Sequence, residues 1–117
     1  ENAYCPYSRF QVGAAVLSAS TGRIYSGCNM ENASYGATIC AERNAITTAV
    51  AAEGRIGLDL IVVASRSSHP APPCAVCLQV ISEFALPETP VILINDEGVE
   101  ERYLFSDLLP HPFEFED

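Results

Sequence analysis

The 117-residue chain contains no lysine and no tryptophan, and only one methionine and two histidines. Without lysine it cannot form a Schiff base with a carbonyl substrate, and it cannot supply the lysine of a phosphate-binding P-loop. It also lacks the run of about 20 apolar residues that a membrane-spanning helix needs, and its start shows no secretory signal pattern. We therefore expect a cytoplasmic protein without a membrane partner.

Positive charge is scarce as well. The six basic residues are all arginines, and the formal net charge is −9. The charge is uneven, because residues 88–117 hold nine of the 15 acidic residues and only Arg102. A surface of this charge repels phosphate backbones. We therefore predict that nucleic acid is not a partner and that a small neutral or cationic substrate suits the protein.

Hydrophobic residues make up 49% of the chain and charged residues 18%, which is typical of one globular domain. Apolar runs bounded by turn residues predict strands at 12–18, 23–28, 58–65, 90–95 and 102–105, and helices at 40–53 and 74–86. The first two strands form a hairpin around Ser20-Thr21-Gly22. This order predicts an α/β fold, a three-layer α/β/α sandwich with a mixed five-stranded sheet.

The five cysteines are an odd number, which argues against a complete disulfide framework, and cytosolic cysteines more often serve metal binding or catalysis. Cys40 stands at the start of one predicted helix, and Cys74 and Cys77 at the start of the other. Helix N-termini stabilise thiolates. Because both helices follow loops at the same edge of the predicted sheet, three thiolates can meet on one Zn²⁺ and leave its fourth position open for water.

Glu42 lies two residues after Cys40, so it can stand beside that open position without being a ligand. Zinc lowers the pKa of a bound water to about 7, and Glu42 can take up the proton and pass it on. A three-cysteine zinc site with a nearby non-ligand Glu is the arrangement of one class of nucleobase deaminases. Arg43 is the candidate cation that offsets the excess negative charge of the thiolates.

Spacing alone leaves three other interpretations open: a structural zinc site, a redox-active dithiol and inert core cysteines. A structural site needs a fourth protein ligand, which would have to be Cys5, Cys28 or His69. A redox dithiol usually follows the first strand of a thioredoxin-like unit. Here the Cys-x-x-Cys pair falls late in the chain, and Cys40 would have no role.

Several short stretches in order along the chain carry a family resemblance. They are Tyr4-Cys5-Pro6-Tyr7-Ser8, Phe10, Val12-Gly13-Ala14-Ala15, Gly27-Cys28-Asn29-Met30-Glu31-Asn32-Ala33, Cys40-Ala41-Glu42-Arg43, Pro73-Cys74-x-x-Cys77, Gln79-Val80 and Leu108-Leu109-Pro110. With these stretches the chain resembles the small, homotetrameric class of cytidine deaminases, within the cytidine deaminase-like superfamily. The zinc motif is shared by that whole superfamily, whereas Asn29-x-Glu31-Asn32 is more specific to the nucleoside enzymes. Gln11 and Leu78 depart from the pattern. The family usually begins with a helix that this sequence lacks, so we expect that an N-terminal helix is missing.

The resemblance implies a role for each matching residue. Cys40, Cys74 and Cys77 would hold one Zn²⁺ per subunit, Glu42 would shuttle protons, and Arg43 would neutralise the thiolates. The implied substrate-binding residues are Asn29 and Glu31 on ribose hydroxyls, the Ala41 backbone and the Phe113 ring on the pyrimidine, Phe10 packed against the ligand, and Ala33 and Tyr35 at positions that related tetramers lend to neighbouring sites.

We therefore expect residues 1–117 to form one zinc-dependent nucleoside deaminase domain, which assembles as a homotetramer with shared active sites. The expected reaction is hydrolytic deamination of cytidine and 2′-deoxycytidine to uridine and 2′-deoxyuridine, with release of ammonia, in pyrimidine salvage. One alternative is a deaminase of a cytosine-nucleoside antibiotic of the blasticidin S type. The other is a non-catalytic zinc-stabilised binding module, which would close its metal site and have no use for Glu42.

Overall fold

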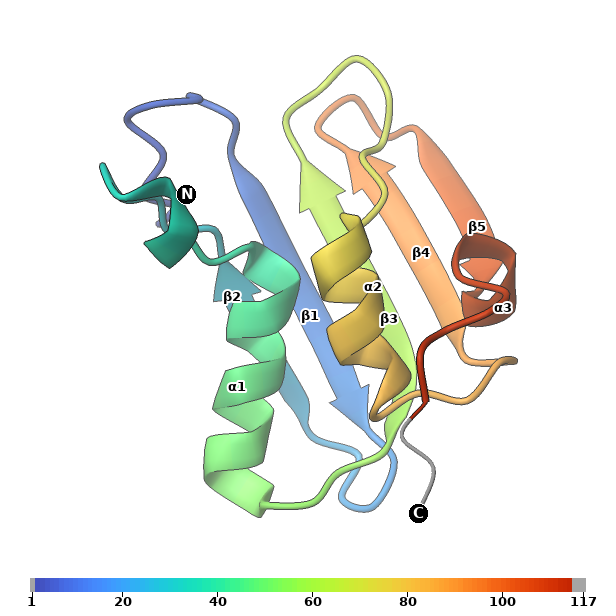
Figure 1. Cartoon of the computed structure of the whole chain (residues 1–117). Helices are drawn as coiled ribbons and strands as arrows, with labels where there is room; N and C mark the ends of the chain where they lie inside the picture. The colour runs from blue at the N-terminus through green and yellow to red at the C-terminus, as the bar shows by residue number, and fades with distance from the viewer. Residues whose placement is uncertain (1, 115–117) are drawn as a thin grey trace.

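The computed structural model of the protein describes residues 2–114, in which five strands form one sheet in the order β2-β1-β3-β4-β5 (Figure 1). The strands are β1 (Val12–Ser18), β2 (Ile24–Cys28), β3 (Leu58–Ser65), β4 (Pro90–Asn95) and β5 (Glu100–Leu104). Strands β3 and β4 pair in parallel and every other pair is antiparallel. The predicted α/β class and the mixed five-stranded sheet are confirmed.

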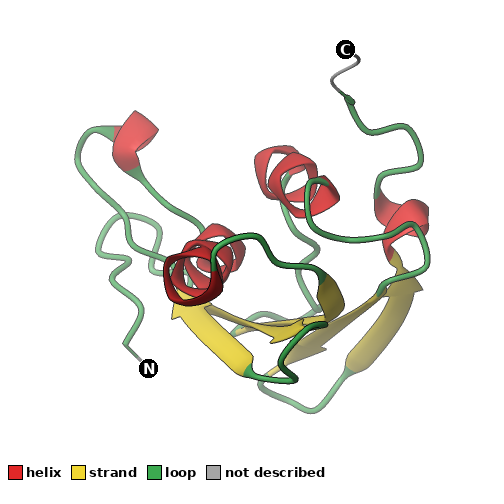
Figure 2. Ribbon diagram, turned by 90° about the horizontal axis from the view of Figure 1, so that it is seen from below, coloured by secondary structure: helices red, strands yellow, loops and turns green. Residues whose placement is uncertain are grey.

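The helices gather on one face of the sheet (Figure 2). They are α1 (Ala41–Glu53), α2 (Ala75–Ser82), the one-turn helix α3 (Phe105–Leu108) and the 3₁₀ turn η1 (Tyr35–Ala37). Of the three predicted layers, residues 2–114 therefore supply the sheet and the helical layer on one of its faces. No helix of these residues is both long and apolar enough to span a membrane.

The core lies between the sheet and helices α1 and α2. Alternate residues of the central strands point under the helices, because side chains of a strand alternate between its two faces. The fully buried members include Val16, Ile61, Val63, Val91 and Leu93. Each such aliphatic side chain contributes about 1.5–3 kcal/mol by leaving water. This layer fixes the position of both helices above the strands.

Helix α1 packs directly on the backbone of β2, and Gly27 makes that approach possible. A Cβ atom on Gly27 would lie 2.4 Å from the Ala45 nitrogen and 2.8 Å from the Ala41 carbonyl oxygen. The Asn44 side-chain amide also donates a 2.7 Å hydrogen bond to the Cys28 carbonyl. The first turn of α1, which carries the predicted site residues, is thus tied to the sheet.

Some element ends differ from the prediction. The helix predicted over 74–86 ends at Ser82, because the chain then turns and the Leu58 N–H bonds to the Phe84 carbonyl at 3.0 Å. The strand predicted at 102–105 covers Glu100–Leu104, and α3 begins at Phe105. Both ends are set by contacts between segments that lie far apart in the sequence.

The predicted helix starts are confirmed. Cys40 is the N-cap residue of α1 and Cys74 is the N-cap residue of α2. The two N-termini lie side by side above the same edge of the sheet (Figure 1). Three cysteines of two separate helices are thereby brought to one place.

Candidate active site

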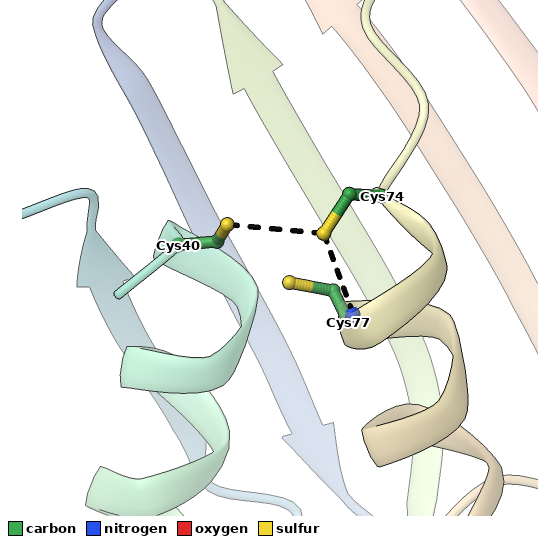
Figure 3. A group of neighbouring side chains, drawn as sticks. All are labelled: Cys40, Cys74 and Cys77. Carbon is green, nitrogen blue, oxygen red and sulfur yellow. Dashed lines mark hydrogen bonds between the residues drawn. The ribbon is translucent and has the colours of Figure 1, made fainter. Parts of the chain in front are cut away.

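The three predicted metal ligands converge. Figure 3 shows Cys40 on α1 and Cys74 and Cys77 on α2 with their sulfur atoms turned toward one another. The three Sγ atoms lie within 4.8 Å of each other, and those of Cys40 and Cys74 are 3.9 Å apart. Cys40 is half-buried, Cys74 is exposed and Cys77 is fully buried. One side of the cluster is therefore closed by protein and the other is accessible.

This geometry fits a zinc ion. Zn–S bonds of about 2.3 Å in tetrahedral geometry place two sulfur ligands about 3.8 Å apart, close to the Cys40–Cys74 separation of 3.9 Å. Within residues 2–114, no further His, Cys, Asp or Glu side chain joins the group. Cys5, Cys28 and His69 therefore do not supply the fourth ligand that a closed structural site needs, and the group keeps one position open.

The helix that carries two of the ligands begins at the cluster. The N–H of Cys77 donates to the Cys74 sulfur at 3.5 Å. Burial is the largest single influence on the Cys74 thiol and works against its ionisation. The hydrogen bonds from Cys77, Cys40 and the Val76 N–H together outweigh burial and lower the pKa of Cys74. Burial, followed by the nearby Glu42 carboxylate, raises the pKa of Cys77. A cationic metal is what allows a buried thiolate such as Cys77 to carry its charge.

Arg43 supplies positive charge next to the sulfur atoms. Its guanidinium lies 3.7 Å from the Cys40 sulfur and donates to the Thr38 carbonyl at 3.3 Å. Contact with the Cys40 sulfur raises the pKa of Arg43, although burial opposes that rise. Its buried Nε has no hydrogen-bond partner among the described residues. A permanent cation is thus placed against the cluster, where it would offset the charge of three metal-bound thiolates.

A cavity of about 320 Å³ opens beside the exposed side of the cluster. Glu42 lines it together with Cys40 and Cys74, although its side chain is only 4% exposed. Burial raises the pKa of the Glu42 carboxyl. The structure therefore brings a buried carboxylic acid, two of the cysteines and a space for a small molecule together, as the sequence predicted.

Four residues with predicted substrate contacts also line this cavity. They are Phe10, Asn29, Glu31 and Ala41. The Asn29 amide accepts from the Val12 N–H at 3.1 Å and donates to the Phe10 carbonyl at 2.7 Å. One Asn29 N–H and part of the Glu31 carboxylate therefore remain for a ligand, since an amide carries two donors and a carboxylate about four acceptor positions.

Three of the predicted substrate-binding residues do not line the cavity of their own chain. Tyr35 borders a neighbouring cavity of about 370 Å³, shared with Tyr7 and Glu31. Ala33 is an exposed loop residue that lines neither cavity. Phe113 lies along α2, with its side chain 73% exposed.

Sequence reasoning assigned no role to several residues that line the cavity. They are Ser8, Val12, Thr38, Val63, Ala71 and Pro72. Ser8 belongs to the Tyr4–Ser8 stretch that carries the family resemblance, and this could have indicated a role for it. The spacing of residues in the sequence does not show which groups Ser8 contacts. Val12 belongs to β1, Val63 to β3, and Ala71 and Pro72 to the loop before α2, so only the fold brings these residues to one cavity.

Comparison with known proteins agrees with this site. The family described as "Cytidine and deoxycytidylate deaminase zinc-binding region" matches residues 1–93. A cytidine deaminase of Halalkalibacterium halodurans is 47% identical over all of this chain and 87% of its own length. A cytidine deaminase of Sporosarcina psychrophila is 45% identical over all of this chain and 85% of its own length.

Solved structures agree as well. The crystal structure of cytidine deaminase from Burkholderia pseudomallei superposes with a TM-score of 0.89, at 43% identity over 96% of this chain and 88% of that one. The crystal structure of cytidine deaminase from Mycobacterium tuberculosis superposes with a TM-score of 0.79, at 37% identity over 97% of this chain and 87% of that one. The three-cysteine site with its adjacent glutamate agrees with the similarity in sequence and in fold. The chain belongs to the cytidine deaminase family of enzymes.

Proposed function

We propose that this protein catalyses the zinc-dependent hydrolytic deamination of cytidine and 2′-deoxycytidine to uridine and 2′-deoxyuridine, with release of ammonia. One observation supports this more than any other. A three-cysteine group with an open fourth position borders the same cavity as a buried, non-ligand carboxyl group. A binding module stabilised by zinc has no need for either feature.

Cys40, Cys74 and Cys77 would hold one Zn²⁺ per subunit. When bound there, zinc supplies a water activated for attack at neutral pH. The chain's own contribution is to leave one coordination position open toward the cavity and to place Arg43 beside the sulfur atoms. Because three thiolates give the metal a net negative charge, this guanidinium limits the loss of its Lewis acidity.

Glu42 would carry the protons. Its carboxylate takes a proton from the attacking water, delivers it to N3 of the pyrimidine, and then helps the C4 amino group leave as ammonia. Each step needs the carboxyl within hydrogen-bond reach of the reacting atoms, and Glu42 lies one residue beyond the backbone of Ala41 at the start of α1. The Ala41 backbone would bind the pyrimidine, which fixes the ring beside Glu42.

The sugar would lie against the Asn29 and Glu31 side chains of the cavity wall. Asn29 offers a donor and Glu31 an acceptor to the ribose hydroxyls, and Phe10 packs against the ligand. A ribose recognised by an Asn and a Glu favours plain nucleosides over a blasticidin S-type antibiotic, whose sugar carries different groups. These residues therefore support cytidine and 2′-deoxycytidine as substrates.

The complete site would be shared between subunits of a homotetramer. Phe113 and Tyr35 are exposed aromatic side chains that do not line the catalytic cavity of their own chain. In a tetramer, Phe113 would stack on the base bound by a neighbour, and the loop with Ala33 and Tyr35 would complete another site. We place the enzyme in the cytoplasm, in pyrimidine salvage.

A substrate panel tests the proposal. The zinc-loaded protein is incubated with cytidine, 2′-deoxycytidine, cytosine and blasticidin S, and the fall in absorbance on deamination is followed. We expect turnover of the two nucleosides and little of the other two compounds. Preferential turnover of blasticidin S would replace the proposed substrate, and no turnover of any compound would favour the binding module.

Glu42→Gln is the matched variant for the panel. We expect kcat to fall by about 10²–10⁴-fold, the usual contribution of a general acid–base group, while the zinc content stays at one ion per chain. Full activity of Glu42→Gln would overturn the assigned mechanism. A carefully purified wild-type sample that binds no zinc would overturn the metal site itself.

A further inference from the structure

Ser8 connects two residues that line the catalytic cavity. Its hydroxyl donates a hydrogen bond to Oε2 of Glu31. The same hydroxyl oxygen accepts from the Phe10 N–H at 3.0 Å. Because a serine hydroxyl has only one proton, that proton is committed to Glu31. Ser8 therefore acts on a ligand through its neighbours and not as a donor of its own.

The Glu31 carboxylate is held by the same turn at three points. The N–H groups of Tyr7 and Ser8 both donate to Oε1 at 3.0 Å, and the Ser8 hydroxyl occupies one position on Oε2. The Ser8 hydrogen bond, followed by the backbone donors, lowers the pKa of Glu31. Of about four acceptor positions on a carboxylate, one remains, on the oxygen that Ser8 holds.

The turn itself is held in a strained form. Arg9, between Ser8 and Phe10, has a φ of 58°, a conformation that costs a non-glycine residue about 1 kcal/mol or more. The hydrogen bond from the Phe10 N–H to the Ser8 hydroxyl spans this residue, and the Arg9 N–H donates to the Cys5 carbonyl at 2.8 Å. The bond across Arg9 fixes the backbone of the turn whose N–H groups donate to Glu31.

We infer that Ser8 is a positioning residue for nucleoside recognition. Its turn occupies three acceptor positions of the Glu31 carboxylate and leaves a single free position for one sugar hydroxyl. This inference rests on the proposed function, in which Glu31 binds the ribose. It adds that the sugar hydroxyl binds Oε2, and that the acceptor is oriented before the substrate arrives. Preorganised groups lose less entropy on binding.

The test compares two substrates in Ser8→Ala and Ser8→Thr. For cytidine we expect Ser8→Ala to raise KM about tenfold or more, with kcat within about twofold, because the lost interaction acts on binding. Ser8→Thr keeps the hydroxyl and restores KM, since Ser8 is exposed and leaves room for a methyl group. With 2′,3′-dideoxycytidine, which lacks both hydroxyls, Ser8→Ala and wild type should have equal kcat/KM.

The dideoxy substrate separates positioning from folding. If Ser8 only supports the fold, Ser8→Ala lowers kcat/KM equally for both substrates, and this result overturns the inference. An unchanged KM for cytidine in Ser8→Ala also overturns it. Ser26→Ala, an exposed serine on β2, is the control for a lost hydroxyl elsewhere. If the wild type does not turn over cytidine, the proposed function fails first and the inference falls with it.

A double-mutant cycle gives an independent measure. In a Glu31→Gln background the carboxylate is absent, so adding Ser8→Ala should change kcat/KM for cytidine by less than about twofold. Additive losses in the double variant would show that Ser8 acts without Glu31, which contradicts the inference. Equal zinc content and equal thermal midpoints in all variants confirm that the comparison is made on folded enzyme.

Discussion

Glu53, the last residue of α1, is held by four hydroxyl groups of the β1–β2 hairpin. It accepts hydrogen bonds from Ser18 at 2.8 Å, Thr21 at 2.7 Å and Tyr25 at 2.6 Å, and a longer one from Ser20. A carboxylate at the C-terminus of a helix is otherwise unfavourable, because it meets the negative end of the helix dipole. The hydroxyl donors, Tyr25 first, lower the pKa of Glu53 to about 2.

The lowered pKa predicts a pH-dependent contribution to stability. The folded state favours ionised Glu53, so its stabilising effect is complete above the ordinary carboxyl pKa of 4.5 and disappears as the pH falls toward about 2. We expect Glu53→Gln to have a lower urea midpoint than the wild type at pH 7, and a smaller difference at pH 3. Each midpoint is taken relative to the wild type at the same pH, which removes the effect of other titrating groups.

The exposed Glu88 provides the control. Glu88→Gln should leave the urea midpoint near that of the wild type at both pH values. A Glu53→Gln difference that is the same at pH 7 and pH 3 would show that the hydroxyl cluster does not favour the ionised form. The sequence does not predict the hydrogen-bond partners of Glu53, because the four donors lie 28 to 35 positions away from it.

At the scale of the elements, the close packing of α1 on β2 positions the site. Gly27 lies under the first turns of α1, and the backbone atoms of Ala41 and Ala45 occupy the space where a Cβ would be. The same turn carries Glu42 and follows Cys40 directly. A shift of α1 would therefore move the proposed ligand Cys40 and the proposed proton carrier Glu42 together.

We expect Gly27→Ala to destabilise the protein by about 1–3 kcal/mol, the usual cost of overpacking, and to weaken zinc binding. The clash is with backbone atoms, so no side chain can rotate to relieve it. Urea unfolding measures the stability, and competition with a chromogenic chelator measures the zinc affinity.

Gly13→Ala is the matched control, since its Cβ would approach no atom closer than the Gly27 carbonyl oxygen at 3.9 Å. The urea midpoint and the zinc affinity of Gly13→Ala should both stay close to those of the wild type. Equal stability and equal zinc affinity in Gly27→Ala and Gly13→Ala would contradict the packing argument.

At the scale of the whole molecule, the C-terminal segment lies along α2. The Gln79 side chain donates to the Phe113 carbonyl at 2.9 Å and accepts from the Phe113 N–H at 3.1 Å. This pair fixes the backbone and leaves the ring exposed, although a bulky aromatic ring is normally stabilised by burial. The arrangement supports the proposal that Phe113 serves the site of another subunit.

Subunit mixing tests a shared site. We expect Phe113→Ala to lower kcat/KM by about tenfold through lost stacking, and Glu42→Gln by about 10²–10⁴-fold. After dissociation and joint reassembly, some sites combine Glu42 of one chain with Phe113 of another. The activity of the mixture should then exceed the mean of the two variants.

Light scattering before and after exchange establishes whether a tetramer is present. A sample mixed without dissociation is the control, and it should show only the mean activity. If the reassembled mixture also shows only the mean, the site is contained within one subunit, and the role proposed for Phe113 is wrong.

The sequence by itself determined the order of the main elements and the groups proposed to react. Continuous apolar runs between turn residues define β3 and β4, because strands at the centre of a sheet covered by helices contribute apolar side chains to the core. The starts of α1 and α2 follow from Cys40 and from the prolines before Cys74. The metal-binding residue types and Glu42 are visible in two short motifs, since their chemistry depends on residue type and local spacing.

The tertiary structure decided what depends on distant contacts. The end of α2, the three bonds from Tyr7 and Ser8 to Glu31, and the separation of Phe113 from its own cavity all involve residues more than 20 positions apart. No local pattern encodes such pairs, because they form only when the sheet register and helix packing bring the segments together. The sequence thus specified which groups are proposed to react, and the fold decided how they are held and which of them line the same cavity.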